Sequence, residues 1–188
     1  IAAEHVTKSP PDGHTLLIGP EAPFVVNPSL YSKLPYDPVK GFTPISGLVT
    51  INHALIAHPS VPVQNVRELI ALARQRPGTL NYGSAGKGSI NHLALELLRA
   101  RTGTDIVHIP YKGIAPATLD LLSGQIQAIT ASIPATLPQL AQNKVKVLAV
   151  TGKRRAKLLP DVPSWEEAGV ADADVVNYWG IVAPVGTP

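Results

Sequence analysis

The chain has 188 residues, 45% of them hydrophobic and 15% charged, which is the composition of a globular protein long enough for one large domain or two small lobes. It contains no cysteine, which excludes disulfides, thiolate metal sites and cysteine nucleophiles, and no apolar run approaches the roughly 20 residues that span a bilayer. The net charge is +3, and the one dense basic cluster consists of Lys153, Arg154, Arg155 and Lys157. Because this cluster contains no aromatic residue, we interpret it as a solvated loop or helix start, with a phosphate-binding patch as the alternative.

The N-terminal third predicts short strands joined by irregular chain. The sequence begins with Ile1 rather than methionine, so we expect a mature or truncated product whose export signal would lie upstream. Residues 15–18 form an apolar run after a Pro-Pro-Asp-Gly turn and predict a buried strand, and residues 54–57 predict another, which Pro59 stops. The proline-punctuated stretch between them predicts irregular loop, with at most one helical turn around residues 29–32.

From residue 64 onward, strands and helices alternate. Apolar residues spaced i, i+3, i+4, i+7 predict a helix over 66–73. The clearest apolar periodicity in the chain predicts a second helix over 90–98, with Ser89 as its N-cap and Gly103 as its stop. The other expected elements are strands at 79–83, 106–109, 126–132, 145–151 and 175–183, a helix with Pro116 in its first turn that Gly124 closes, a helix at 135–142, and a short helix that Ser164 and Glu167 cap and Gly169 ends.

This alternation predicts an α/β fold in which a mostly parallel sheet is covered by helices on both faces. The crossovers between parallel strands are right-handed, and in such sheets ligands bind outside the carboxyl ends of the strands. The site is therefore expected where a predicted strand passes into a predicted helix.

The sharpest feature at such a junction is the segment 83–89, Gly-Ser-Ala-Gly-Lys-Gly-Ser. Glycine lets the backbone approach a ligand closely, and the following helix start offers unpaired N–H groups and about half a positive charge. Such a segment can bind a carboxylate or a phosphate through its main chain, with Ser84 and Ser89 as additional hydroxyl donors. The alternative is an ordinary glycine-rich turn without a ligand.

Two familiar motifs do not fit this segment. A nucleotide P-loop requires Ser or Thr directly after its Gly-Lys pair, but Gly86-Lys87 is followed by Gly88. A hydrolase nucleophile elbow requires glycine two residues before the serine, but Tyr82 stands before Ser84. The segment is therefore interpreted as neither of these.

The titratable residues give no metal, cofactor or catalytic pattern. Of the six histidines, His53 and His58 lie around a strand at a spacing that points them to opposite faces. His92 lies in the first turn of a predicted helix, where it faces either an anion or solvent, and His108 is interpreted as structural. Glu21 is either a solvated loop acid or part of a ligand loop.

The sequence shows no set of nucleophile, base and orienting group. The competing hypothesis from another class is a small α/β hydrolase or transferase that uses Ser84 or Ser89 with His92. A change of Ser84 to alanine that removes turnover but not binding would distinguish it from a binding protein.

A series of short motifs then runs through the chain in order. They are Pro-Asp-Gly-His-Thr-Leu-Leu at 11–17, Asn-Pro-Ser-Leu-Tyr at 27–31, Leu-Pro-Tyr-Asp-Pro at 34–38, Leu-Asn-Tyr-Gly-Ser at 80–84, Val-His-Ile-Pro-Tyr-Lys-Gly at 107–113, Leu-Ala-Val-Thr at 148–151, Leu-Pro-Asp-Val-Pro at 159–163, and the segment 180–188. Together the motifs resemble the receptors of the tripartite tricarboxylate transporter system, the Bug-type periplasmic binding proteins.

The resemblance implies a two-lobed, type II periplasmic-binding-protein fold that closes on a small organic acid, a mono-, di- or tricarboxylate. The acid would be delivered to the membrane permease subunits of the transporter, in the periplasm, with no catalytic residue, cofactor, metal or nucleic-acid partner. Against the family pattern, we expect residues 1–52 to be a partial lobe one, 53–183 an essentially whole lobe two, and 184–188 the start of the return to lobe one. Such a fragment could expose apolar surface, dimerise or bind ligand weakly.

The resemblance also assigns site residues. The loop comprising Ser84, Ala85, Gly86, Gly88 and Ser89 would grip one carboxylate through backbone N–H groups. The loop 19–24, with Glu21 and Ala22, would face the ligand from lobe one, with Glu21 directed away from the anion or reading a polar substituent. Many relatives carry an acid where Ala131 stands, so this chain is expected to prefer a plain or aromatic carboxylate over an amino-bearing one. The set that would tune the distal end of the ligand is Thr130, Ala131 and Ser132.

Overall fold

The computed structural model describes residues 2–173 and 175–188, which form two compact units. One unit comprises Ile1–Thr50 with Asn177–Pro188, and the other comprises Ile51–Val176. The chain thus divides at 50/51 and 176/177 rather than at the expected 52/53 and 183/184. The second boundary comes earlier because the last strand pairs with the first strand of the chain.

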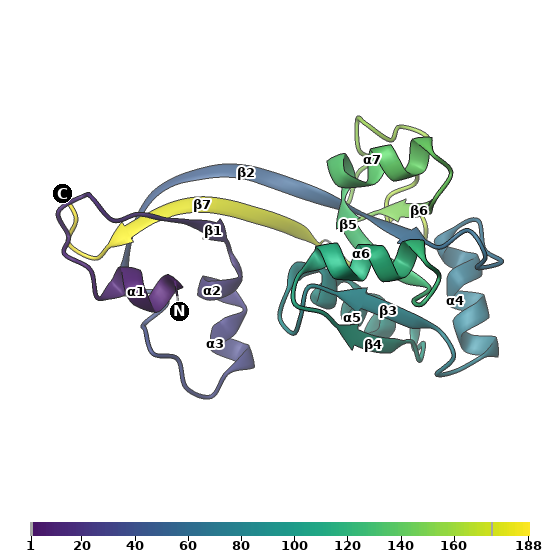
Figure 1. Cartoon of the computed structure of the whole chain (residues 1–188), viewed down its shortest axis with the longest axis horizontal. Helices are drawn as coiled ribbons and strands as arrows, with labels where there is room; N and C mark the ends of the chain where they lie inside the picture. The colour runs from purple at the N-terminus through teal and green to yellow at the C-terminus, as the bar shows by residue number, and fades with distance from the viewer. Residues whose placement is uncertain (1, 174) are drawn as a thin grey trace. The chain divides into compact units, whose positions relative to one another are not determined.

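The second unit is built on a mixed sheet in the order β6-β2-β5-β3-β4 (Figure 1). Three of its strands run parallel, β3 (Asn81–Ser84), β4 (Val107–Pro110) and β5 (Ala128–Ser132). The second half of β2 (Phe42–Ala57) runs antiparallel to β5 and to β6 (Lys146–Val150). Since β2 is antiparallel to both β5 and β6, the strand β6 runs in the direction of β3, β4 and β5, so the expected mostly parallel sheet is confirmed in this unit for every strand except β2.

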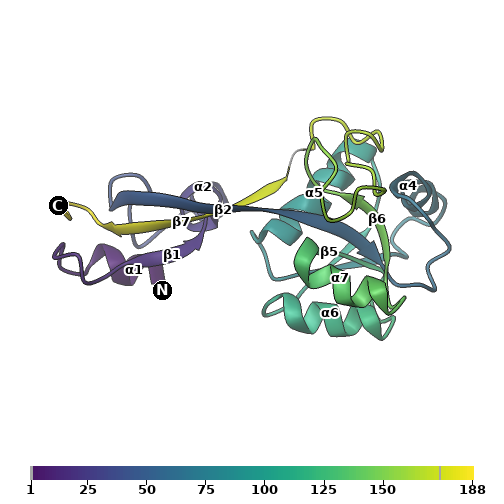
Figure 2. The ribbon, with the colours of Figure 1, turned by 90° about the horizontal axis from the view of Figure 1, so that it is seen from above.

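Helices cover both faces of this sheet, as expected (Figure 2). On one face lie α4 (Val66–Gln75) and α5 (Ile90–Thr102), and on the other lie α6 (Ile114–Leu122) and α7 (Ile133–Ala141). The strands alternate between the two cores that result. The α5-side core includes Leu55, Tyr82, Leu95, Leu98, Ala128 and Trp165, and the α6-side core includes Ile56, Leu121, Ile129 and Ala131.

The helix ends follow the local sequence signals. Ser89 caps α5 by accepting a hydrogen bond from the His92 N–H, and Gly103 ends the helix in the left-handed conformation at φ 62°. Ser164 and Glu167 form both hydrogen bonds of a capping box, but the chain after them makes turns and not the expected helix. The Trp165 N–H donates to the Val150 carbonyl, so this segment is tied to the end of β6 instead.

The first unit contains β1 (Leu17–Pro20), β7 (Val176–Pro184) and the first half of β2, with the short helices α1 (Ala2–Thr7), α2 (Ala22–Val25) and α3 (Asn27–Leu30). Its small core joins Ala3, Val6 and Phe42 to partly buried neighbours. The expected buried strand at 15–18 is shifted to 17–20 and is not buried, since Ile18 is 59% exposed.

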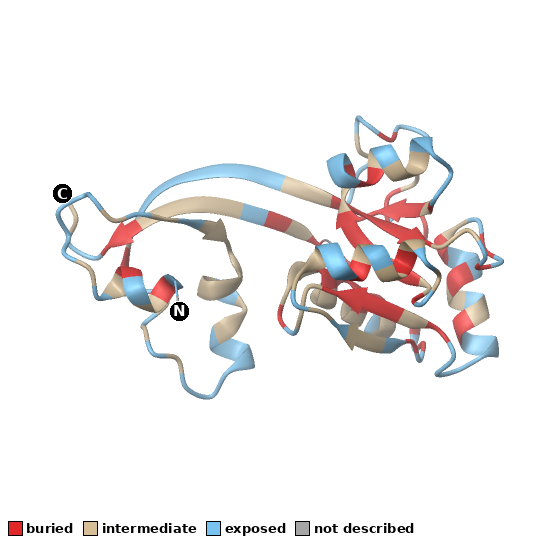
Figure 3. Cartoon of the chain, in the orientation of Figure 1, coloured by how far each residue is buried: buried red, intermediate tan, exposed pale blue. Residues whose placement is uncertain are grey.

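The expected irregular stretch between 18 and 54 ends in a strand of 16 residues, β2, whose middle is exposed. Figure 3 shows the buried residues concentrated in the second unit. Among the residues described, no helix is both long enough and apolar enough to cross a membrane.

Candidate functional site

The glycine-rich segment joins β3 to α5 at the edge of the second unit where β3, β4 and β5 all end. β3 finishes at Ser84, and α5 begins at Ile90. Gly86 and Gly88 adopt φ values of 114° and 79°, which side chains other than glycine rarely tolerate. A Cβ added at Gly86 would also lie 3.3 Å from the Tyr111 carbonyl oxygen, so this loop conformation requires glycine there.

Some N–H groups of this segment are already used within the loop. The Gly86 N–H donates to Ser84 Oγ at 3.1 Å, the Gly88 N–H to His92 Nδ1 at 3.3 Å, and the Ser89 N–H to the Gly86 carbonyl at 3.2 Å. From residue 85 to residue 91, four N–H groups have no hydrogen-bond partner among the described residues, those of Ala85, Lys87, Ile90 and Asn91.

These four donors lie in the loop or in the first turn of a helix of 13 residues, where the helix dipole favours negative charge. The expectation that Gly86, Gly88 and Ser89 offer their N–H groups to a ligand is wrong for this structure, because all three donate to nearby acceptors instead. The arrangement can bind an anionic oxygen through the main chain, and sequence reasoning had not singled out Lys87, Ile90 or Asn91.

A row of polar residues borders the loop along the same edge of the sheet. Four strands contribute one residue each: β3 contributes Ser84, β5 contributes Thr130, β2 contributes His53, and the residue just after β6 is Thr151. The strand registers place all four side chains on the face of the sheet that α5 covers. Asn91, at the start of α5, donates to the Thr130 carbonyl oxygen at 2.5 Å. The first turn of α5 and the end of β5 are therefore brought together.

Two atoms in this row, His53 Nδ1 and Thr130 Oγ1, are buried without a hydrogen-bond partner among the described residues. Burial lowers the pKa of His53 to about 4, so its imidazole is neutral near pH 7. Ser132 lies on the same face as Thr130, whereas Ala131 packs in the α6-side core. The Ala131 side chain is therefore directed away from the polar row.

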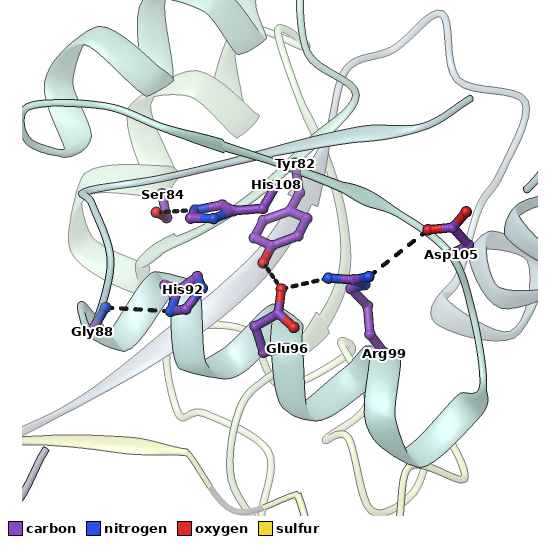
Figure 4. Close-up of polar contacts among 8 residues, drawn as sticks. All are labelled: Tyr82, Ser84, Gly88, His92, Glu96, Arg99, Asp105 and His108. Atoms are coloured by element: carbon purple, nitrogen blue, oxygen red, sulfur yellow. Dashed lines mark hydrogen bonds and ion pairs between the residues drawn. The ribbon is translucent and has the colours of Figure 1, made fainter. Parts of the chain in front are cut away.

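Two imidazoles lie behind the loop (Figure 4). His108 Nε2 is 2.6 Å from Ser84 Oγ, and the His108 ring stacks on Tyr82 with its centroid at 4.8 Å. The His92 ring lies 4.3 Å from the His108 ring, centroid to centroid. Burial lowers the pKa of both histidines, and for His108 the neighbouring His92 lowers it further.

A hydrogen-bonded chain continues from these rings along α5. The Tyr82 hydroxyl donates to Glu96 Oε1, and Arg99 Nη1 donates to the same oxygen at 2.6 Å. Burial would raise the pKa of Glu96, but the hydrogen bonds from Tyr82 and Arg99 outweigh it and lower that pKa. Burial, followed by the bond to Glu96, raises the pKa of Tyr82. The Glu96 carboxylate is therefore ionised, its charge is balanced by Arg99, and it is not available as a free base.

The residues of the competing enzyme hypothesis do not form a nucleophile and base. Ser84 is fully buried, and its hydroxyl is bonded to Gly86 and His108 rather than to His92. The Ser89 hydroxyl donates to the Gly86 carbonyl at 2.7 Å and caps α5. His108, which sequence reasoning interpreted as structural, is thus the imidazole that contacts Ser84. The one available signal was its position on the strand next to Tyr82.

The remaining expected site residues lie in the first unit. Glu21 is the N-cap of α2 and Ala22 is the first residue of that helix. The Glu21 carboxylate accepts hydrogen bonds from Asn177 Nδ2 at 2.7 Å and from the Tyr178 N–H at 2.9 Å. The Glu21 carboxylate was expected either to point away from a bound anion or to read a polar substituent of the ligand. Its pairing with β7 favours the first of these. Glu21 also lines an open, mainly apolar groove of about 570 Å³ in this unit, together with Phe24 and parts of β2 and β7.

The mixed sheet, with a helix N-terminus at its edge, has the fold of the periplasmic binding proteins. The profile of the tripartite tricarboxylate transporter family receptors matches residues 1–188, and the chain belongs to this family.

Solved structures agree closely with the chain. Rpa4515 of R. palustris, determined with adipate, is 38% identical with a TM-score of 0.93, over 100% of this chain and 62% of its own. MatC from Rhodopseudomonas palustris, with bound malate, is 33% identical with a TM-score of 0.89, over 100% of this chain and 64% of its own. The periplasmic binding protein BugD is 34% identical with a TM-score of 0.89, over 98% and 62%.

The chain spans little more than half the length of the curated relatives that it matches from end to end, between 54% and 58% of each.

Proposed function

We propose that the chain is the ligand-holding part of an extracytoplasmic receptor that captures a small organic carboxylate. The receptor then delivers this acid to the permease subunits of a tripartite tricarboxylate-type membrane transporter. The observation that carries the proposal is the set of four unpaired N–H groups at the β3–α5 loop. Membership of a receptor family, and relatives determined with adipate and malate, support a carboxylate over a phosphate.

In this proposal one carboxylate of the ligand binds to free main-chain N–H groups of the loop from Ser84 to Ser89 and of the first turn of α5. Gly86 and Gly88 supply the positive φ angles, and Ala85 with Lys87 and the first turn of α5 supply the donors. No catalytic step is proposed, because the serine hydroxyls of the loop are used within it.

Thr130 and Ser132 would contact the far end of the ligand, since they lie beside the loop on the α5 side of the sheet. Ala131 is not part of the proposal, because its side chain packs in the α6-side core, on the face of the sheet opposite the loop. Glu21 and Ala22 remain candidate contacts in the first unit. That unit would correspond to part of lobe one, and the second unit to lobe two.

The test is binding of adipate and malate to the chain by isothermal titration calorimetry. Gly86→Val should abolish binding, because the substitution forces a β-branched residue to φ 114° and crowds the Tyr111 carbonyl. Gly113→Val is the matched control, because Gly113 has φ 115° in the neighbouring β4–α6 turn, where a Cβ meets nothing within 4 Å. If Gly86→Val binds either acid as tightly as Gly113→Val does, the anion site lies elsewhere.

Self-association of the chain is a separate part of the proposal. Large apolar residues of the first unit are more than one-third exposed, among them Leu16, Ile18, Ile45, Leu48 and Val49. Exposed apolar strands of this kind favour pairing between copies. Sedimentation equilibrium should therefore give a dimer mass, and Ile18→Lys with Leu48→Lys should give a monomer. A monomer mass for the unaltered chain would refute this part alone.

A further inference from the structure

The N–H groups of both glycines that shape the β3–α5 loop are linked by hydrogen bonds to a histidine ring, one directly and one through a serine hydroxyl. The Gly88 N–H donates directly to His92 Nδ1 at 3.3 Å. The Gly86 N–H donates to Ser84 Oγ at 3.1 Å, and that oxygen lies 2.6 Å from His108 Nε2. The two contacts come from different elements, His92 from α5 and His108 from β4, so the loop is fixed from two sides (Figure 4).

The two rings support each other. His92 and His108 lie 4.3 Å apart between centroids at an interplanar angle of 39°, and His108 stacks on Tyr82 at 20°. Tyr82 is fully buried, so this stack is anchored in the α5-side core. A ring that is packed on both faces has little freedom to turn away from its hydrogen bond.

We propose that His92 and His108 are positioning residues, which hold the β3–α5 loop in its anion-accepting conformation through the N–H groups of Gly88 and Gly86. His92 does so only as the neutral imidazole that carries its proton on Nε2. In this form the Nδ1 lone pair is free to accept from Gly88.

The two contacts respond differently to protonation. A proton on His92 Nδ1 places a donor against the Gly88 N–H donor, and that hydrogen bond is lost. The Ser84 hydroxyl can donate or accept, so its contact with His108 Nε2 persists in either state of the ring. Only the Gly88 half of the loop is therefore expected to loosen in acid.

The charged groups around the pair favour the neutral form near pH 7. Burial lowers the pKa of both rings, and the cations Lys87 on the loop and Arg99 on α5 lower it further. Glu96 on α5 acts in the opposite direction, but its carboxylate is shared by Tyr82 from β3 and by Arg99, which in turn lies 3.8 Å from Asp105. The balance leaves His92 as an acceptor at neutral pH.

The direct test follows the backbone amides by NMR in the ¹⁵N-labelled chain, over a pH range of about 4 to 8 that covers imidazole titration. In the unaltered chain, hydrogen-exchange protection of the Gly88 amide should disappear with the midpoint of the His92 ring. His92→Asn places an amide oxygen near the position of Nδ1 and does not titrate, so Gly88 should stay protected throughout. His92→Leu removes the acceptor, so Gly88 should be unprotected at every pH.

The corresponding pair for the other half is His108→Gln, which places an amide near Nε2, and His108→Leu, which removes it. Ser84 Oγ, which accepts from the Gly86 N–H, is present in both variants, so Gly86 should stay protected in the first and show reduced protection in the second, where the Ser84 hydroxyl loses the ring nitrogen that orients it. Gly88 protection in His92→Leu equal to that of the unaltered chain, or a Gly88 titration that persists in His92→Asn, would overturn the proposal.

The consequence for ligand binding rests on the proposed function. Adipate affinity should fall about five- to tenfold in His92→Leu and His108→Leu, the equivalent of one lost hydrogen bond, and should be largely kept in His92→Asn and His108→Gln. If the leucine variants bind adipate as the unaltered chain does, the rings do not position the site. If the unaltered chain binds neither adipate nor malate, the proposed function fails, while the amide measurements still decide the role of the histidines.

Discussion

Replacing Ser84 with alanine removes a hydroxyl that holds two neighbours. The Ser84 side chain is fully buried, and its oxygen lies 3.1 Å from the Gly86 nitrogen and 2.6 Å from His108 Nε2. The substitution creates almost no cavity, so the cost comes from the two polar groups that lose their partner. One unpaired buried group costs about 1–3 kcal/mol. Because Gly86 and His108 are only half-buried, water replaces part of the loss, and we expect about 2 kcal/mol in total.

Urea unfolding measures this cost through the fluorescence of Trp165, which is fully buried in the second unit. The background is Trp179→Phe, because the sequence contains two tryptophans and the other lies in the first unit. With a slope of about 2 kcal/mol per M of urea, a loss of about 2 kcal/mol lowers the midpoint by about 1 M.

Ser123→Ala is the control, since the exposed Ser123 hydroxyl donates only to the Asp120 carbonyl and should change stability by less than about 0.5 kcal/mol. Equal midpoints for Ser84→Ala and Ser123→Ala would refute the pairing of Ser84 with Gly86 and His108. A hydrolytic activity lost in Ser84→Ala at unchanged stability would instead favour the enzyme hypothesis.

Three further predictions concern the core, the pH dependence and the ligand. Gly83→Ala should destabilise the chain by about 1–3 kcal/mol in thermal denaturation, because its Cβ would lie 2.5 Å from Ile126 Cδ1, whereas Gly47→Ala meets nothing within 4 Å and should be neutral. Burial lowers the pKa of His53 from 6.5 to about 4, so the unfolded chain binds more protons between these values. Stability should then be full above a pH of about 6.5 and fall by about 3 kcal/mol toward pH ~4, a slope that urea titrations should find reduced in His53→Leu. Adipate should bind at least about tenfold more tightly than 6-aminohexanoate in calorimetry, since Thr130 and Ser132, the side chains proposed for the far end of the ligand, offer no negative charge to an ammonium group; equal affinities would contradict this.

The region from 64 to 151 could be predicted from the sequence because its signals are local. The start of α5 depends on Ser89 and its end on Gly103, and both lie within a turn of the helix that they define. The long strand β2 could not be predicted in this way. Its middle residues are exposed on both faces and show no alternation, and its pairs lie far along the chain, such as His53 with Ser132.

The same distinction applies to the site. The glycines of 83–89 identified the loop, because positive φ is a property of the residue itself. Which N–H groups stay free depends on acceptors supplied by other elements. Ser84 is near in sequence, but its partner His108 lies on another strand, and nothing local indicates that His92 turns Nδ1 toward Gly88. The sequence therefore identified the segment but not the individual donors.

Buried polar atoms without a partner lie beside the free backbone donors at one edge of the second unit, and this placement is itself an argument for binding there. Within the described residues, four buried side-chain atoms have no hydrogen-bond partner, and two of them, His53 Nδ1 and Thr130 Oγ1, lie in the polar row beside the β3–α5 loop. Each costs about 1–3 kcal/mol in a fold that holds itself together by a small margin. If these positions served only the core, apolar residues would fill them at no cost in stability. Leu55 and Ala128, two residues away from His53 and Thr130 on the same strands, are apolar residues of the α5-side core. Polar groups at these strand ends lower the stability of the fold beside the free backbone donors of the proposed anion site, which is the pattern expected of a site kept for its ligand.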